Sequence, residues 1–316
     1  MEIGILLSTA PPEDPIHAAH LKPREAWSGS ERLEEAVRSR RLMCRRLYEP
    51  LFTFVADHGR LNVWYDGEPY RPCDIVIYRP NFHEEPSLHR HVLEALRTIR
   101  QPMLNGNFAA NDIKNKIWQH RCLAEAGIPL PRWAIAKSSR AADCAADHLH
   151  FPLILKVAFG THGKGVFFVE NRETLAPIVD YLGIRDGNPV IMEEFIAAAE
   201  HRDIRIFVVG GMVIASMQRT ARSRDIRANA ALGGTGTPII PTPAECALAV
   251  RASAVFELDF AGVDVIRSPQ GALVLEVNAH PGFKELELCT GVDVAGAIVE
   301  EALKKIQQGD KKAKTC

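Results

Sequence analysis

The sequence predicts an α/β protein made of two or three compact lobes, and three observations lead to that fold class. The chain has 316 residues, of which 47% are hydrophobic, so it can bury more than one sizeable core. Short apolar runs at 2–7 and 73–78 flank a helical pattern over 31–47, which indicates a small α/β lobe over 1–103. In the second half of the chain, apolar runs of strand length dominate.

Local patterns give the elements of the N-terminal lobe. The helix is expected because apolar residues recur at Leu33, Val37, Leu42 and Leu47. Arginines crowd its second half, where positive charge complements the helix dipole, and a docking surface for an acidic partner is the alternative. The segment 8–30 contains prolines at four positions and is predicted to be an irregular loop.

A second unit begins near Asn105, and its first helix is expected over 114–126 because Gly127 and nearby prolines end it. The lysine-rich tail over 309–316 is predicted to be disordered. Between this first helix and the tail, we expect strands at 153–158, 166–169 and 190–195, followed by a β-rich run over 203–219. A polar loop over 221–237, a helix over 243–257, a hairpin over 261–278 and a last helix over 292–307 complete the unit.

The composition narrows the class of protein. The 38 basic side chains nearly balance the 39 acidic ones, so no general attraction to nucleic acid or to an anionic membrane is expected. The seven cysteines form no C-x-x-C pair, which argues against a disulfide scaffold or structural zinc. The start resembles a strand and not a signal peptide, and no apolar run reaches membrane length. We therefore expect a cytoplasmic protein without a membrane partner.

A glycine-rich loop joins the two strands at 153–158 and 166–169. Glycines bring backbone N–H groups close to an anion, although the loop alone fits an ordinary hairpin equally well. It is not a Walker A loop, because no Lys-Ser/Thr pair and no helix follow it. The loop residues are Gly160, Thr161, His162, Gly163, Lys164 and Gly165.

Two lysines near this loop favour phosphate binding. Lys156 lies within an apolar strand, where a lysine is costly unless it meets a negative partner. It precedes the loop by four residues and could reach a phosphate beneath it. Lys116 on the preceding helix is a second candidate, which by itself would be taken for a solvated helix lysine.

The hairpin over 261–278 predicts a metal site. Glu276 and Asn278 are two apart on one strand and therefore share a face. If the loop is a three-residue turn at 269–271, Asp264 falls opposite Glu276, whereas a two-residue loop would place it on the other face. Two carboxylates and an amide oxygen suit Mg²⁺, and the alternative is a surface cluster of like charges.

Arginines supply further candidates between the glycine loop and the hairpin. Asp203 and Arg205 alternate on one strand, and Arg219 ends another. Arg227 and Asn229 lie in the polar loop just before a Gly-Gly pair. Guanidinium groups suit phosphate and carboxylate oxygens and can stabilise a transferring phosphoryl group.

The order of these parts resembles the ATP-grasp superfamily, and most closely its RimK-like branch of amino-acid ligases. The matching segments cover about 116–300 and are KIWQHRCLAEAGIPLP, LILKVAFGTHGKGV, VIMEEFI, DIRIFVVGGMVIASMQR, RANAALGG, AGVDVIRS, LVLEVNAHPG and TGVDVAGAIVE. The resemblance implies an ATP-grasp fold with an N-terminal α/β lobe over 1–103, a central lobe with a glycine-rich lid over 104–188 and a C-terminal lobe with the metal site over 189–308, with ATP between the two β-rich lobes.

The resemblance also implies a role for each nucleotide-site residue. Lys116 and Lys156 would hold the phosphates beneath the glycine loop, which would act as a lid. Glu194 and Phe195 would form the hinge that reads adenine. Asp203 would lie near the ribose, with Arg205 in the same site.

The remaining implied roles concern the reaction. Arg227 and Asn229, with Arg219, would meet the γ-phosphate and the acyl-phosphate. One or two Mg²⁺ ions, or Mn²⁺, would be held by Asp264, Glu276 and Asn278.

The function implied is a carboxylate–amine ligase that works through an acyl-phosphate. Its acceptor would be a carboxylate of a peptide, protein tail or metabolite, and glutamate or another amino acid would be added. One alternative is a dipeptide or natural-product peptide ligase of the same fold, and another is a non-catalytic nucleotide sensor. The protein could form a homo-oligomer under any of these functions. Two departures leave the substrates open: Ala230, Ala231 and Leu232 replace basic residues usual in ribosomal-protein glutamate ligases, and His280 replaces the usual Ser.

Overall fold

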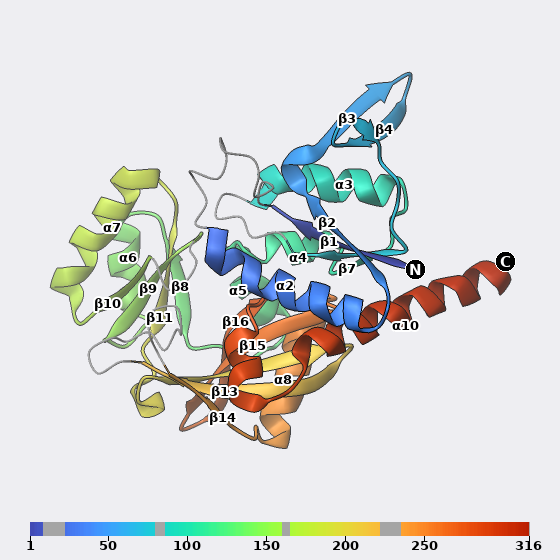
Figure 1. Cartoon of the computed structure of the whole chain (residues 1–316). Coiled ribbons are helices and arrows are strands. Elements are labelled where there is room, and N and C mark those ends of the chain that lie inside the picture. The colour runs from blue at the N-terminus through green and yellow to red at the C-terminus, as the bar shows by residue number, and fades with distance from the viewer. Residues whose placement is uncertain (9–22, 80–85, 160–164, 222–234, 316) are drawn as a thin grey trace.

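A computed structural model shows three lobes around a central junction (Figure 1). It describes residues 1–8, 23–79, 86–159, 165–221 and 235–315. Their strands form four sheets: a parallel one near the N-terminus, a small antiparallel one that projects from it, and one antiparallel sheet in each of the other two lobes.

The N-terminal lobe contains a parallel sheet in the order β2-β1-β6-β7. Helix α2 (Pro23–Ser39) packs on one face and α3 (Arg90–Thr98) on the other. The strands are β1 (Glu2–Leu7), β2 (Met43–Tyr48), β6 (Ile75–Tyr78) and β7 (Met103–Leu104).

The helix expected over 31–47 was placed too far along the chain. The α2 helix ends at Ser39, and Arg41 adopts a left-handed φ of 58°. Leu47 therefore lies in β2, fully buried in the core under α3. Leu42 and Leu47 are five residues apart, a spacing that places two side chains on different faces of a helix, so these leucines did not support a helix beyond Ser39.

A second feature of this lobe was not predicted. A three-stranded arm, β3 (Phe52–Asp57), β4 (Arg60–Tyr65) and β5 (Glu68–Pro69), projects from the lobe at the upper right of Figure 1. A 3₁₀ turn, η1 (Glu49–Leu51), leads into it.

The central lobe has an antiparallel sheet in the order β10-β9-β11-β8, with α6 and α7 packed together on one face (Figure 1). The strand β11 was expected to open the C-terminal lobe, but it pairs with β8 and β9 instead. The elements are β8 (Trp133–Ala136), α6 (Ser139–Ala146), β9 (Leu153–Val157), β10 (Val166–Val169), α7 (Arg172–Asp186) and β11 (Val190–Glu194).

The C-terminal lobe has a five-stranded antiparallel sheet in the order β14-β13-β12-β15-β16. Its strands are β12 (Arg202–Val209), β13 (Met212–Thr220), β14 (Thr235–Pro238), β15 (Phe260–Ser268) and β16 (Gly271–Asn278). Short 3₁₀ segments, η2 (Pro86–His89) and η3 (Ala197–Ala199), lie outside the sheets.

Helices cover both faces of this sheet. One face packs against α4 (Phe108–Asp112), α5 (Lys116–Glu125) and α8 (Pro243–Ala254), so α4 and α5 join this lobe and not the central one. The other face packs against α9 (Lys284–Thr290) and α10 (Val294–Thr315). Because α10 continues to Thr315, most of the tail expected to be disordered over 309–316 is helical.

The N-terminal and C-terminal lobes share one hydrophobic core. Ile5 and Ile77 of the parallel sheet belong to the same buried cluster as Phe207 and Phe260 of the antiparallel sheet, with α2 and α10 between them. Of the four clusters, the central lobe has its own, which includes Leu155. The site between the lobes therefore has one separately packed wall.

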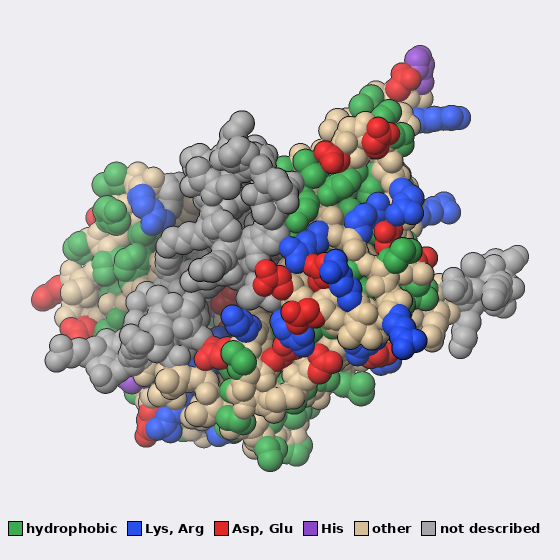
Figure 2. Space-filling model, in the orientation of Figure 1, with side chains coloured by type: hydrophobic (Ala, Val, Ile, Leu, Met, Phe, Trp, Pro, Cys, Tyr) green, Lys and Arg blue, Asp and Glu red, His purple; other side chains and the backbone are tan. Residues whose placement is uncertain are grey.

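The described helices and the face drawn in Figure 2 bear on the expected absence of membrane and polyanion partners. No helix in the described ranges is long and apolar enough to cross a membrane. Figure 2 shows basic and acidic side chains intermixed over the face that carries α2. Arg32 there contacts Glu287 at 2.8 Å, and Arg40 contacts Glu300 at 2.7 Å.

Candidate active site

The hairpin β15–β16 places Asp264 directly opposite Glu276, but by a different route from the one expected. Ser268 pairs with Gly271, so the loop has two residues and not three. A β-bulge then shifts the register: Val265 pairs with Val274 and Asp264 with Glu276, which leaves Leu275 as the extra residue. The bulge thus restores the alignment that a two-residue loop would otherwise have removed.

Asp264 is buried and carries two arginine partners. Arg219 Nη2 lies 2.9 Å from its Oδ2, and Arg205 donates to both carboxylate oxygens, with Nη2 at 2.9 Å from Oδ2. Burial by itself raises the pKa of Asp264, but the two guanidinium groups outweigh it and hold that pKa at about 2. The carboxylate is therefore ionised at neutral pH.

Arg219 also holds Asp203. Its Nε donates to Oδ1 at 2.6 Å and its Nη2 to Oδ2 at 2.9 Å, and the side chain is 7% exposed. The strand pairing explains this contact, because Asp203 of β12 lies opposite Arg219 of β13. Two aspartates and two arginines thus form one buried cluster across three neighbouring strands, with their charges balanced. Sequence reasoning had assigned Asp203 to the ribose and Arg219 to the phosphoryl group.

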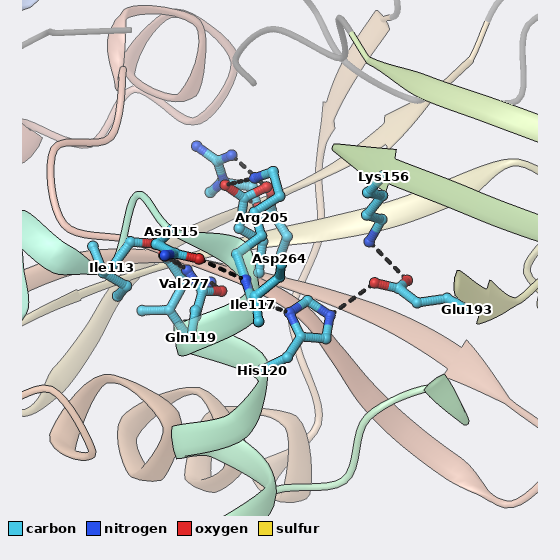
Figure 3. A network of polar contacts seen from close by, with 12 residues as sticks. Ile113, Asn115, Ile117, Gln119, His120, Lys156, Glu193, Arg205, Asp264 and Val277 are labelled. Carbon is cyan, nitrogen blue, oxygen red and sulfur yellow. Dashed lines mark hydrogen bonds and ion pairs between the residues drawn. The ribbon is translucent and has the colours of Figure 1, made fainter. Parts of the chain in front are cut away.

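Lys116 faces the other carboxylate of the hairpin. Its Nζ lies 2.8 Å from Glu276 Oε1. Burial raises the pKa of Glu276, but Lys116 outweighs it, so the net shift is downward. The Gln119 amide fixes this geometry, because it donates to the Val277 carbonyl and accepts from the Val277 N–H, each at 2.9 Å. These two bonds fasten α5 to β16 (Figure 3).

Lys156 of the central lobe is held by a buried acid. Its Nζ lies 2.7 Å from Glu193 Oε2, and the other Glu193 oxygen lies 2.7 Å from His120 Nε2 (Figure 3). His120 Nδ1 donates to the Lys116 carbonyl at 2.8 Å. Burial raises the pKa of Glu193, yet Lys156 and His120 lower it to about 2. His120 therefore links the central lobe to α5.

Sequence reasoning missed Glu193, His120 and Gln119. A signal was present for Glu193, because it interrupts the apolar run VIM as Lys156 interrupts LILKV, and the two side chains neutralise each other. The spacing of His120, one helical turn after Lys116, was a weaker signal.

The oxygen donors of the hairpin fit Mg²⁺. Asp264 and Glu276 are paired across the strands, and Asn278 lies opposite Gly262 two positions further on. No group of three or more His, Cys, Asp or Glu side chains is arranged for a metal within the described parts of the chain. A set of two carboxylates and one amide matches a hard cation that keeps several waters.

The predicted adenine hinge makes hydrogen bonds within the protein. The Glu194 N–H donates to the Arg132 carbonyl at 2.9 Å, and the Phe195 N–H donates to Pro152 at 3.1 Å. The Glu194 carboxylate accepts from His150 Nδ1 at 2.8 Å, which directs it away from Lys156. The adenine role of these two residues stays a prediction.

Several predicted residues lie outside the described part of the chain. Gly165 is described: its φ is +78°, and a Cβ there would lie 2.4 Å from Val157 Cγ2, so only glycine fits the end of the loop. Those outside the described residues are Gly160, Thr161, His162, Gly163, Lys164, Arg227 and Asn229.

Comparisons with known proteins agree with this arrangement. The RimK-like ATP-grasp domain model matches residues 113–302. A probable alpha-L-glutamate ligase of Maridesulfovibrio salexigens is 39% identical over 260 residues, which cover 80% of this chain and 84% of that protein. Another from Histophilus somni (strain 2336) is 38% identical over 230 residues, 72% of this chain and 77% of that protein.

Solved structures show the same fold. The ATP-grasp ligase PsnB in complex with a minimal precursor superposes with a TM-score of 0.71 at 18% identity, covering 96% of this chain and 98% of PsnB. A RimK-domain ATP-grasp protein from Sphaerobacter thermophilus gives 0.69 at 20% identity, covering 95% and 99%. With the family model spanning most of the two β-rich lobes, the chain belongs to the RimK-like ATP-grasp family of ligases.

Proposed function

We propose that the protein uses ATP and Mg²⁺ to add glutamate, or a closely similar amino acid, to a carboxylate acceptor through an acyl-phosphate. Curated relatives at 38–39% identity are named probable alpha-L-glutamate ligases, which supports glutamate as the amino acid. One solved PsnB complex contains Mg and ADP, which supports the same requirement here.

The observation that carries the proposal is the convergence of opposite charges from two lobes. Lys116 and Glu276 pair on one side, and Lys156 and Glu193 on the other. Lys116 is the main cause that lowers the pKa of Glu276, and the charge of Lys156 adds a smaller contribution in the same direction. Lysines of this kind hold phosphates, and the carboxylates hold the metal that accompanies them. A nucleotide-free scaffold would not need either pair, because a whole buried ion pair can often be replaced by well-packed apolar side chains without loss of stability.

In the proposed reaction, a carboxylate oxygen of the acceptor attacks the γ-phosphorus of ATP and ADP leaves. The amine of the amino acid then attacks the acyl carbon, forms the amide and releases inorganic phosphate. Mg²⁺ bound by Asp264, Glu276 and Asn278 would neutralise charge on the phosphates. Lys116 and Lys156 would orient the triphosphate, and Arg219 and Arg205 would place positive charge beside Asp264.

The test is acceptor-dependent ADP formation. Purified protein is incubated with ATP, Mg²⁺, L-glutamate and a glutamate-terminated peptide, and products are identified by mass spectrometry. We expect ADP, phosphate and a peptide heavier by one glutamyl residue. Extension of free glutamate instead of the peptide would identify the dipeptide ligase alternative. ATP binding without ADP formation under any acid–amine pair would contradict the proposal and favour a nucleotide sensor.

A matched pair of variants tests the metal hairpin. Glu276→Gln keeps the shape of the side chain but removes the negative charge, and we expect turnover to fall by about 100-fold or more. Glu173→Gln, at an exposed position at the start of α7, makes the same chemical change far from the site and should leave turnover unaltered. Equal activity of the two variants would rule out the proposed role of the hairpin.

A further inference from the structure

Three basic side chains from distant parts of the sequence gather beside the candidate metal hairpin. Arg79 directly follows β6, at the carboxyl edge of the parallel sheet. His280 lies two residues after Asn278, the last residue of β16. Lys114 precedes Asn115, whose side chain caps the N-terminus of α5. The charges of Arg79 and Lys114 both act on His280, so the three side chains lie close together, and we call this cluster of three residues the basic pocket.

Arg79 is buried with a guanidinium nitrogen that has no partner. The residue is 9% exposed; Nη2 donates to the Pro281 carbonyl at 3.2 Å, and the guanidinium lies over the Phe283 ring at 5.2 Å. Nη1 is buried without a hydrogen bond among the described residues. Gly29 of α2 makes room for this group, because a Cβ there would lie 3.1 Å from Nη2.

Among the residues that the structure describes, no acidic side chain compensates this charge. Burial lowers the pKa of Arg79 to about 10, and no carboxylate of the described residues opposes that shift. This contrasts with Arg205 and Arg219 nearby, which are each paired with aspartate. A buried cation without a counter-ion is unfavourable, and an entering anion would remove that penalty.

His280 lies against Tyr78 with both ring nitrogens unused. Nδ1 and Nε2 are buried and make no hydrogen bond within the described ranges, and the ring centroid lies 5.4 Å from that of Tyr78 in an edge-on arrangement. The Tyr78 hydroxyl is already donated to Asn111 at 3.0 Å. His280 therefore adds a second unused N–H donor to the pocket.

Lys114 connects the pocket to the metal hairpin. It is half-buried, and burial, with the positive charges of Lys116 and Arg79, lowers its pKa to about 8, whereas the Glu276 charge opposes that shift. Its ammonium group thus lies within electrostatic reach of both the hairpin and Arg79. The pocket borders the place where phosphoryl transfer is proposed to occur.

We propose that Arg79, Lys114 and His280 bind a carboxylate group of the substrate next to the metal hairpin. A guanidinium with a free N–H and a neighbouring donor matches the two oxygens of a carboxylate. Ligands of open α/β sheets also bind at the carboxyl edge of the strands, where Arg79 lies. The identity of the carboxylate as a substrate group rests on the proposed ligase function, but its binding does not require turnover.

The binding test uses four N-acetylated probes that differ only in charge. N-acetyl-L-glutamate carries two carboxylates, N-acetyl-L-glutamine only the α-carboxylate, N-acetyl-L-isoglutamine only the side-chain carboxylate, and N-acetyl-L-glutamine amide none. Near saturation, we expect a carboxylate probe to raise the Tm of the wild-type protein by roughly 2–4 °C, and the neutral amide to leave it unchanged. Comparing the two single-carboxylate probes shows which carboxylate the pocket selects.

The variant Arg79→Met should remove this carboxylate effect. Methionine fills much of the same space beside Phe283 without burying a charge, so the Tm without ligand is expected to stay equal or rise. A merely structural Arg79 would instead lower it. The Tm increase caused by ATP should be retained, which shows that loss of carboxylate binding is not loss of the nucleotide site.

A pair at position 114 provides an independent readout. Lys114→Arg keeps the charge and should retain the probe-induced Tm increase, whereas Lys114→Met should lose it. In the ligase assay, Lys114→Met should raise KM for the acceptor or amino acid about tenfold and change KM for ATP less than about twofold.

Two outcomes would overturn the inference. One is that no carboxylate probe raises the wild-type Tm more than the neutral amide. The other is that Arg79→Met and Lys114→Met retain the wild-type response. By contrast, carboxylate binding without any ADP formation would contradict the proposed ligase reaction and leave the pocket supported.

Discussion

The central lobe and the rest of the molecule are built differently, although both line the candidate site. The N-terminal and C-terminal lobes share a core in which Ile77 and Phe207 belong to one buried cluster. The central lobe closes its own core around Leu155 and Met192. We therefore predict that Lys156 belongs to a wall that can shift as a unit, whereas Lys116 and the basic pocket are held on a fixed frame formed by the two lobes that share a core.

Polar contacts tie the two parts together near the site, and one of them is made by the Lys116 N–H, which donates to the Ala158 carbonyl just after β9 at 3.1 Å. His120 of α5 reaches across to Glu193 of β11, which in turn holds Lys156 (Figure 3). These contacts set the position of Lys156 relative to Lys116. Substitutions on either side of the contact should therefore have distinguishable effects.

The largest effects are expected from truncations in the two cores. Phe207→Ala removes a fully buried ring whose centroid lies 6.0 Å from that of Phe283, and should lower the free energy of unfolding by about 3–5 kcal/mol. Hydrogen exchange should speed up in both β1 and β12. Leu155→Ala should cost about 2–5 kcal/mol, with faster exchange limited to β8–β11.

Hydrogen exchange followed by mass spectrometry distinguishes the two cases segment by segment. Val55→Ala, on the exposed side of the projecting arm at 46% exposure, is a control that should alter neither pattern. If Leu155→Ala accelerated exchange in β12 as strongly as in β9, the lobes would form one cooperative unit. The difference in their packing would then have no dynamic consequence.

The next largest effect on stability is expected at Glu193, which joins the central lobe to α5, and its dependence on pH provides the test. The Glu193 pKa of about 2 is below the ordinary value of about 4.3 for an unfolded chain. Ionised Glu193 therefore stabilises the fold above about pH 4.3, by about 3 kcal/mol, and this contribution is lost as pH falls toward 2. Glu193→Gln should be less stable than wild type at pH 7, and the difference should vanish near pH 2.

Denaturant unfolding at a series of pH values measures that difference. Glu94→Gln, at an exposed position of α3, serves as the control and should track wild type at every pH. A stability gap for Glu193→Gln that stayed constant from pH 7 to 2 would mean that the Glu193 charge is not what holds the contact together.

The sequence predicted those site residues whose burial would be unfavourable in their local sequence, such as a charged side chain within an apolar strand. Lys156 stood out because a lysine in an apolar strand needs an anion, and the structure supplies Glu193. The Asp264–Glu276 alignment was also predicted, yet the stated reason was wrong, because the loop has two residues and the bulge at Leu275 compensates. Turn length alone cannot reveal a bulge four residues away.

Other features depend on contacts that no local pattern encodes. The basic pocket joins positions 79, 114 and 280. The sequence singled out only His280, as a departure from the usual Ser, and no local pattern connected it with the other two positions. Pairing of β11 with β8 and β9 follows from the tertiary arrangement, since a strand at 190–194 reads the same at the end of one sheet or the start of the next. The separation into a shared core and a separate core likewise required the structure.

A smaller effect is expected at the base of the central lobe's glycine loop. Gly165→Ala would strain a residue with a φ of +78° and bring a Cβ to 2.4 Å from Val157, so we expect a loss of about 2–3 kcal/mol confined to β9–β10. Gly67→Ala is the matched control: its φ is +79° but nothing lies within 4 Å, so about 1 kcal/mol is expected. Equal losses for the two variants would show that backbone strain, and not Val157, requires the glycine.

The smallest effect should come from the ion pairs that fasten α2 to the C-terminal lobe. Arg32 is 36% exposed and contacts Glu287 at 2.8 Å and Asp293 at 3.3 Å. Because solvent screens such pairs, Arg32→Ala should cost at most about 1 kcal/mol, and the cost should shrink in 1 M salt. A loss of several kcal/mol, insensitive to salt in chemical denaturation, would mean that charges and not the buried core around Phe207 join the two lobes of the fixed frame.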